Sequence, residues 1–284
     1  LYYGLHRIAQ PYLSRALLFF ILTTCLGIAV KRPRDRSSPR GALYTILGFY
    51  ILLPILLAVP LNETLEGSNF LDLYFEMFAC LTTTGATIIN NLSDTPKAIL
   101  SWRAILQWLG GIGIIVMAIT LMPIMNVGGM QLFKISSNDS SEKLLPKSKE
   151  IALRLIYVYL ALTTFCAITY KIFGMSFFDS ITHSMTTIAT GGFSNYNESI
   201  GYFDSLPIEI SSMFFIILGS LPFIAYIKFL NGDKKIFTSD VQIKSFIKII
   251  IFSIILLFLY LFFQSGDFSE INIRAIFFNV ISIL

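Results

Sequence analysis

The sequence predicts an all-α membrane protein in which one unit repeats: a long apolar helix, a short apolar helix and a second long apolar helix. Three observations predict this fold class: the composition, the lengths of the apolar runs and the alternation of charge between them. The 284 residues are 55% hydrophobic and 13% charged, and the mean hydropathy is +0.73. Because a soluble domain carries about a quarter charged residues, this composition excludes an ordinary soluble protein.

Six apolar runs have about the length of 20 residues that a bilayer-spanning helix needs. They are residues 11–30, 42–60, 104–125, 151–173, 207–230 and 245–264. Pro54, Pro123 and Pro222 fall inside these runs or at their ends. Membrane helices tolerate proline where neighbouring groups satisfy the freed backbone, so we expect six spans.

The charge between these runs alternates. Basic residues gather in 31–40, 126–150 and 228–248, which the positive-inside rule places in the cytoplasm. The connections with few or no basic residues then face outside: 61–101, 174–206 and the segment from 265 onward. Six spans fit this alternation, and the net charge of +4 gives no reason to expect nucleic-acid binding.

Two of the outer connections each contain a shorter apolar run, 70–83 and 176–190. Runs of this length do not cross a bilayer and are typical of re-entrant segments. Each ends in threonine and glycine, so the order of span, short helix, Thr-Gly turn and span occurs twice. Asp72 precedes Gly85 by 13 residues and Asp179 precedes Gly191 by 12, so aligning the two units on these residues requires a gap of one residue.

A turn of this kind has a specific use inside a membrane. Non-helical backbone at membrane depth persists only where it is buried in protein or lines a water-filled cavity. Glycine reaches positive φ without steric cost, and backbone carbonyls placed there can replace the hydration shell of an ion. Ligation by oxygen alone suits a hard cation such as K⁺. We therefore expect a K⁺ filter at Thr82, Thr83, Thr84, Gly85, Ala189, Thr190 and Gly191.

Two ionisable residues, Glu76 and His183, lie within the short helices. An ionisable group at membrane depth is a functional candidate, and we expect both to support the pore helices. A hydrogen bond that pins the helix and a direct role with the ion remain open alternatives. Likewise, Gly110, Gly111 and Gly113 are open to two interpretations, as sites of close helix packing or as a hinge.

The motifs LYFEMFACLTTTGATI (73–88), QWLGGIGI (107–114) and VGGMQLF (127–133) resemble the first pore loop and the following helix of Trk-type potassium uptake proteins. In the same way, HSMTTIATGGFSNYNESIGYFDS (183–205) resembles their second pore loop and RAIFFNVISIL (274–284) their third pore helix. The resemblance implies a potassium-channel type of fold, with four repeats of helix, pore loop and helix around one pore.

The resemblance divides the chain into five segments. They are an N-terminal transmembrane helix and basic loop (1–41), a first repeat (42–126), a cytoplasmic linker (127–150), a second repeat (151–230), and a cytoplasmic loop with an incomplete third repeat (231–284). On this interpretation the chain is truncated within the third repeat.

The function implied is potassium uptake through a multi-pass protein of the bacterial inner membrane, in contact with lipid. The resemblance implies a homodimer and a cytosolic nucleotide-binding regulatory subunit. No nucleophile–base pair and no phosphate-binding glycine loop occur in the sequence, so we expect neither enzymatic activity nor a cofactor. Two alternatives are a truncated, non-conducting remnant and a coupled carrier of organic solutes; the parallel run of the two units disfavours the carrier. The choice between K⁺ and Na⁺ stays open.

Overall fold

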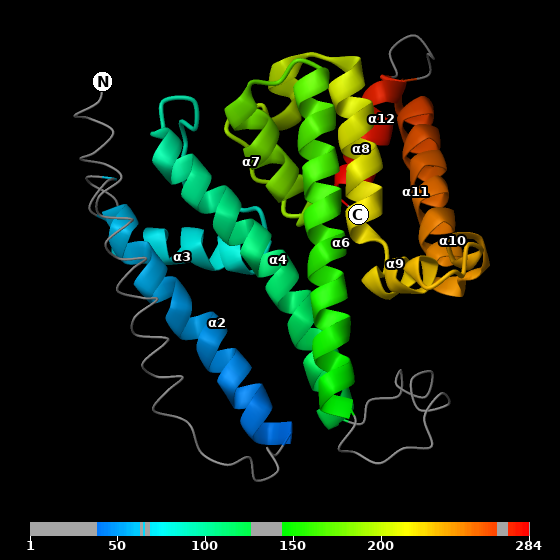
Figure 1. Ribbon diagram of the computed structural model, residues 1–284. Coiled ribbons are helices and arrows are strands. Elements are labelled where there is room, and N and C mark those ends of the chain that lie inside the picture. The colour runs from blue at the N-terminus through cyan, green and yellow to red at the C-terminus, as the bar shows by residue number, and fades with distance from the viewer. Residues whose placement is uncertain (1–38, 63–64, 66–68, 126–143, 266–271, 284) are drawn as a thin grey trace. The chain divides into compact units, whose positions relative to one another are not determined.

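The computed structural model describes residues 39–62, 65, 69–125, 144–265 and 272–283, and all their regular elements are helical (Figure 1). The predicted first span, 11–30, lies outside these residues. The chain forms two compact units, 1–139 and 140–284. Each unit is described below by itself.

The first unit contains two long helices with a short one between them. They are α2 (Pro39–Asn62), α3 (Phe70–Leu81) and α4 (Lys97–Met125). The short helix α3 packs against both long helices, and the Tyr74 hydroxyl fastens it to α2 by donating to the Ile51 carbonyl at 3.2 Å. This unit has the predicted order of long, short and long helix (Figure 1).

Helix α4 begins at Lys97, seven residues before the apolar run from which the span was predicted. The additional turns include Arg103, whose charge places it outside an apolar run. In the structure this residue is 1% exposed. Hydropathy alone does not predict that a charged residue is buried, because such burial depends on an oppositely charged partner.

The second unit repeats this arrangement and extends it. Its elements are α6 (Leu144–Ile172), α7 (Phe177–Ile188), the 3₁₀ turn η2 (Ser199–Phe203), α8 (Leu206–Ser220), α9 (Phe223–Leu230), α10 (Ile236–Ser239), α11 (Val241–Ser265) and α12 (Ile273–Ile283). The short α7 packs against α6 and α8, and α12 packs against α8 and α11. Figure 1 shows α11 and α12 following the break after α8.

The predicted span 207–230 is broken into two helices, since α8 and α9 meet at an angle of 85°. Pro222 has no N–H to donate and disfavours helical backbone in the preceding residue. Leu221 is accordingly extended, with φ −69° and ψ 148°. The Leu218 carbonyl near this break accepts a hydrogen bond from the Tyr226 hydroxyl at 2.6 Å. Hydropathy records the length of an apolar run but not a change of direction within it.

By length and composition, three helical segments in the described part of the chain can cross a membrane: Lys97–Ile115, Glu150–Ile172 and Val241–Gln264. The bent pair α8–α9 is a fourth if it counts as one span. Helix α6 exposes Tyr157, Phe165 and Ile168 and buries Thr163, which is the distribution expected where lipid is the solvent.

Candidate functional site

The short helices α3, α7 and α12 each begin at a residue whose side chain caps the helix, so their sequences can be aligned on these caps. The side-chain oxygens of Asn69, Ser176 and Asn272 each accept a hydrogen bond from a backbone N–H of the first turn, at 3.4, 3.1 and 3.1 Å respectively. Such caps satisfy N–H groups that a helix leaves without an internal partner. Positions in α3, α7 and α12 can therefore be compared by counting from the cap.

The first short helix ends in a tight turn that includes two residues with positive φ. The Thr84 N–H donates to the Ala79 carbonyl at 3.0 Å and closes the last helical turn. Thr83 has φ 55° and Gly85 has φ 76°. Positive φ is uncommon for a residue with a Cβ, so the surrounding structure has to hold Thr83 in place.

The second short helix ends in the same turn. The Gly191 N–H donates to the Thr186 carbonyl at 3.0 Å, Thr190 has φ 50° and Gly192 has φ 77°. Thr190 therefore corresponds to Thr83 in its φ value and in the backbone hydrogen bonds around it. Two segments far apart in the chain thus adopt one backbone conformation.

This correspondence corrects the pairing made from the sequence. The structural partner of Gly85 is Gly192 and not Gly191. With this pairing the two repeats align without a gap, since Asp72 precedes Gly85 by 13 residues and Asp179 precedes Gly192 by 13. The set of residues predicted from the sequence did not include Gly192, which has the same φ as Gly85. The equal distance of 13 residues from Asp72 to Gly85 and from Asp179 to Gly192 indicates this pairing in the sequence.

The threonine hydroxyls of the first turn bind within the turn. Thr82 Oγ1 donates to the Phe78 carbonyl at 2.8 Å and lies 2.7 Å from Thr84 Oγ1. The second turn has Ala189 and Gly191 at these two positions, which carry no hydroxyl. The shared backbone conformation therefore does not depend on these hydroxyls.

A glycine in the following helix contacts the end of each short helix. A Cβ at Gly110 of α4 would lie 2.3 Å from the Leu81 carbonyl oxygen, and a Cβ at Gly219 of α8 would lie 2.9 Å from that of Ile188. Leu81 and Ile188 are the last helical residues before the two turns. Gly110 thus serves close packing, whereas Gly113 has open space beside it.

Behind the first turn lies a buried ion pair. Glu76 Oε1 accepts from Arg103 Nε at 2.6 Å and from the Thr87 hydroxyl at 3.0 Å, while Oε2 accepts from the Ile88 N–H at 2.8 Å. The two charged side chains are 0% and 2% exposed. The Glu76 carboxylate thereby joins α3, α4 and the extended segment that leaves the turn. Sequence analysis identified Glu76 but missed Arg103, because the predicted span began one residue later.

The corresponding residue behind the second turn is His183, which is also buried. Its Nδ1 lies 2.9 Å from the Asp179 carbonyl and its Nε2 lies 2.9 Å from Ser194 Oγ. A carbonyl only accepts, so Nδ1 carries the proton. Ser194 Oγ accepts from the Tyr196 N–H and can donate its own proton to Nε2. A neutral imidazole satisfies all these contacts.

The extended segment that leaves the second turn also forms hydrogen bonds with the first turn of α7. Asp179 Oδ1 accepts from Asn195 Nδ2 at 2.8 Å, and Oδ2 accepts from the Tyr196 hydroxyl at 3.1 Å. Burial and the Asp179 carboxylate raise the pKa of Tyr196, so the phenol remains a donor near neutral pH. The Tyr196 ring stacks on Tyr202 with centroids 3.5 Å apart.

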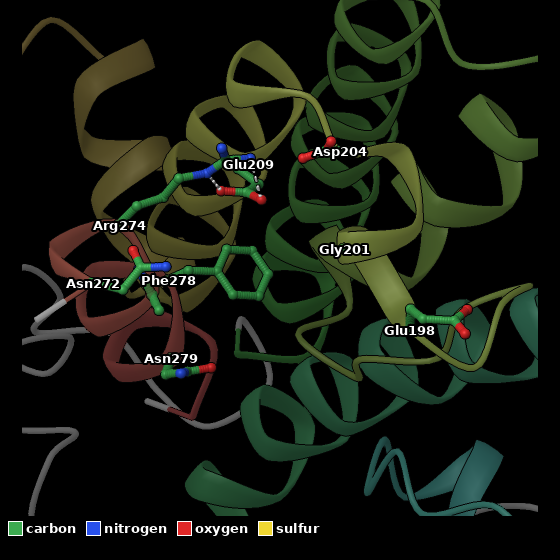
Figure 2. Close-up of a pocket in the computed structure, with 9 residues that line it drawn as sticks. Glu198, Gly201, Asp204, Glu209, Asn272, Arg274, Phe278 and Asn279 are labelled. Carbon is green, nitrogen blue, oxygen red and sulfur yellow. Dashed lines mark hydrogen bonds and ion pairs between the residues drawn. The ribbon is translucent and has the colours of Figure 1, made fainter. Parts of the chain in front are cut away.

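The third short helix, α12, is joined to α8 by a two-point ion pair (Figure 2). Arg274 Nη2 donates to Glu209 Oε1 at 2.6 Å, and Arg274 Nε donates to Oε2. A cavity of about 420 Å³ beside the pair is lined by Glu198, Gly201, Asp204, Glu209, Asn272, Arg274, Ala275, Phe278 and Asn279. Asn279 lies seven residues after its cap, at the position that Glu76 and His183 occupy in the other short helices.

Among the described residues, no group of three or more His, Cys, Asp or Glu side chains is placed to hold a metal ion. Cys80 and Cys166 are buried and form no disulfide.

Comparison with known proteins places the chain in a family. The TrkH family, described as a cation transport protein, matches residues 14–282. The Trk system potassium uptake protein TrkH of Vibrio parahaemolyticus is 40% identical over 257 residues, which are 86% of this chain and 52% of that protein. TrkI of Halomonas elongata is 33% identical over 274 residues, which are 96% of this chain and 54% of the relative.

A solved structure is also similar. The crystal structure of the potassium transporter TrkH from Vibrio parahaemolyticus matches with a TM-score of 0.83 and 31% identity, over 97% of this chain and 57% of that one. The chain spans about half the length of the curated relatives it matches. These matches confirm the resemblance found in the pore-loop motifs and the predicted all-α membrane fold. The chain belongs to the TrkH family of cation transport proteins.

Proposed function

We propose that this chain forms part of a path for K⁺ uptake across the bacterial inner membrane, and that its two Thr-Gly turns supply main-chain oxygens to the ion. The observation that carries the proposal is the repetition of one uncommon backbone conformation. Thr83 and Gly85 have φ 55° and 76°, and Thr190 and Gly192 have φ 50° and 77°. A pore formed by repeats needs equivalent carbonyl positions from each repeat.

The position of the turns supports the same function. Each follows the C-terminal end of a 12-residue helix, where the helix macrodipole places about half a negative charge. A cation at the turn would be attracted by this end without any carboxylate in contact with it. The K⁺ ion would keep its single positive charge and would bind weakly enough to leave the site, as conduction requires.

The proposed filter differs by one residue from the set predicted from the sequence. It consists of Thr82 to Gly85 in the first turn and Ala189 to Gly192 in the second, with Gly192 added. Thr82 and Ala189 cap the two helices, so their carbonyls begin the turn. The carbonyls from Thr83 and Thr190 onward are then the candidate ligands.

We also propose, from the family, that the protein works as a homodimer with a cytosolic nucleotide-binding subunit. The basic residues Lys228, Lys234 and Lys235 are exposed and would offer positive charge to such a subunit. Co-purification with and without lysine-to-glutamine changes at these positions tests the contact. Loss of the subunit in the altered protein alone would support it.

Growth of a bacterial strain without its own potassium uptake tests the proposed function. We expect the protein to restore growth at low external K⁺ and to take up Rb⁺ as a tracer. Gly85→Ala should abolish the rescue at unchanged membrane abundance. Growth that is restored equally by Gly85→Ala would contradict the filter. Absence of rescue and of uptake by the unaltered protein would instead favour a non-conducting remnant.

A further inference from the structure

The Glu76–Arg103 pair is costly to bury and contacts the strand just beyond the first turn. Replacing a buried ion pair by apolar groups is often neutral or stabilising, so fold stability alone is a weak reason for its presence. The carboxylate also accepts from Thr87 and Ile88, which follow Gly85 by two and three residues. The pair therefore holds backbone that is continuous with the proposed filter.

We propose that Glu76 and Arg103 are positioning residues for the first filter turn, and that the charge of the pair sets how strictly this turn prefers K⁺ to Na⁺. The inference rests on the proposed function. Arg103 holds the carboxylate in one place through a charge-assisted hydrogen bond at 2.6 Å. The carboxylate in turn fixes the extended segment after Gly85 through Thr87 and Ile88. A filter held in this way cannot contract around the smaller Na⁺ without breaking charge-assisted hydrogen bonds.

The geometry makes α4 the support for this arrangement. Arg103 and Gly110 are seven residues apart, so they lie on one face of the helix, two turns from each other. Gly110 contacts the Leu81 carbonyl at the end of α3, and Arg103 binds Glu76 five residues earlier in α3. The two contacts hold α3 against α4 at two positions along the helix. Both contacts resist movement of the turn relative to α4.

The second repeat uses neutral residues at the same positions. His183 replaces Glu76, and Ser194 replaces Thr87. Aligning Gly219 with Gly110 puts Ser212 in the place of Arg103, and Ser212 donates within its own helix to the Glu209 carbonyl at 2.8 Å. The two turns thus share a backbone and differ in the charge behind it. Only the first should depend on an ion pair.

Two measurements on the purified protein in lipid nanodiscs test the proposal. Hydrogen exchange tests whether the pair holds the segment after Gly85, and thermal unfolding tests the preference for K⁺. The variants are Glu76→Gln, Arg103→Gln, and the double variant Glu76→Gln/Arg103→Met, which removes both charges at similar volume. Exchange is followed in peptides that contain Ile88, with peptides that contain Ser194 as the internal control. Unfolding is measured in KCl and in NaCl at equal concentration, because an ion that binds only the folded state raises the unfolding temperature.

We expect each single variant to accelerate exchange around Ile88 by about 10- to 100-fold, the effect of losing a hydrogen bond to a charged group. Exchange around Ser194 should not change. The difference in unfolding temperature between KCl and NaCl should decrease. The double variant should regain thermal stability in NaCl and still lack the full preference for K⁺. Tyr74→Phe, which alters the opposite side of α3, is the matched control and should match the unaltered protein in exchange.

Several results would overturn the inference. Unchanged exchange around Ile88 in both single variants would show that the pair does not hold the strand. Full recovery of the K⁺ preference in the double variant would show that the charge is unnecessary. If Arg103→Gln does not fold, Arg103→Lys keeps the charge, loses the planar fork and should show the same acceleration in smaller degree. If the unaltered protein unfolds at one temperature in both salts, the proposed filter fails, and the exchange data still decide whether the pair holds the strand.

Discussion

Gly85 and Gly192 occupy the same position in two successive loops, each 16 residues after the residue that caps its short helix and each with φ close to 77°. Between them lie 106 residues of chain, including the complete long helices α4 and α6. Only glycine adopts such a φ at low cost, so both positions are constrained by backbone conformation.

Gly192→Ala should impair the second turn through the backbone alone. A Cβ at Gly192 meets nothing within 4 Å, so no clash contributes. We expect a cost of about 1–2 kcal/mol from the left-handed conformation. Thermal unfolding and Rb⁺ uptake measure it. Gly201→Ala, where there is equal space and no positive φ, is the control; equal effects of the two changes would contradict the explanation.

Gly110→Ala should affect the first turn through packing. The new Cβ would lie 2.3 Å from the Leu81 carbonyl, and backbone on both sides leaves little room to shift. Overpacking of this kind costs about 1–3 kcal/mol. Gly219→Ala, at 2.9 Å from Ile188, should cost less. Denaturant unfolding in mixed micelles ranks the variants.

Gly113→Ala is the counterpart of the packing test. It lies in the same helix, with open space beside it, so an unchanged or slightly raised stability is expected. If Gly113→Ala reduces uptake while Gly110→Ala does not, the glycines act as a hinge and the packing explanation is wrong.

Tyr226→Phe should weaken the break between α8 and α9. The change removes the hydroxyl that donates to the Leu218 carbonyl at 2.6 Å, at a cost of about 1 kcal/mol. Spin labels at the exposed Phe214 and Phe229 report the bend. A continuous helix would separate the two backbone positions by about 22 Å. We expect a shorter distance in the unaltered protein and a broader distribution in Tyr226→Phe; a narrow distribution at the helical distance in both would contradict the break.

The ion pair between Arg274 and Glu209 should contribute little to stability and more to the position of α12. The side chains are 40% and 13% exposed, and ion pairs with solvent access contribute little to stability because water screens them. Glu209→Gln and Arg274→Gln should therefore each lower the unfolding temperature only slightly. The exchanged pair Glu209→Arg/Arg274→Glu should restore the contact between α8 and α12, measured by cross-linking. Cross-linking that is indifferent to all three changes would show that the pair does not fasten α12.

The sequence was sufficient to predict the short helices and their turns, because an apolar run too short to span and followed by Thr-Gly has few other uses in a membrane protein. It was insufficient for Arg103, since the burial of a charge depends on a partner 27 residues away. The break at Pro222 was also missed. A proline in an apolar run is compatible with a kinked span and with two helices, and the local backbone at Leu221 decides between them.

The pairing of Gly85 failed for a different reason. Two adjacent glycines, Gly191 and Gly192, offered two alignments, and the Thr-Gly dipeptide favoured the wrong one. The choice depends on which residue has positive φ, and a dipeptide does not reveal this. Counting from the capping residues Asn69 and Ser176 would have resolved it.

Carbonyl chemical shifts from solid-state NMR test whether the two turns bind K⁺ through main-chain oxygens. The protein is reconstituted in lipid bilayers with ¹³C at the carbonyls of threonine and glycine, and Na⁺ is exchanged for K⁺ in steps. The account predicts that the signals from Thr83 to Gly85 and from Thr190 to Gly192 shift together, with one K⁺ midpoint, while those of Gly110 and Gly219 stay in place. Signals at both turns that remain unchanged at saturating K⁺, in protein whose helical signals are intact, would contradict it.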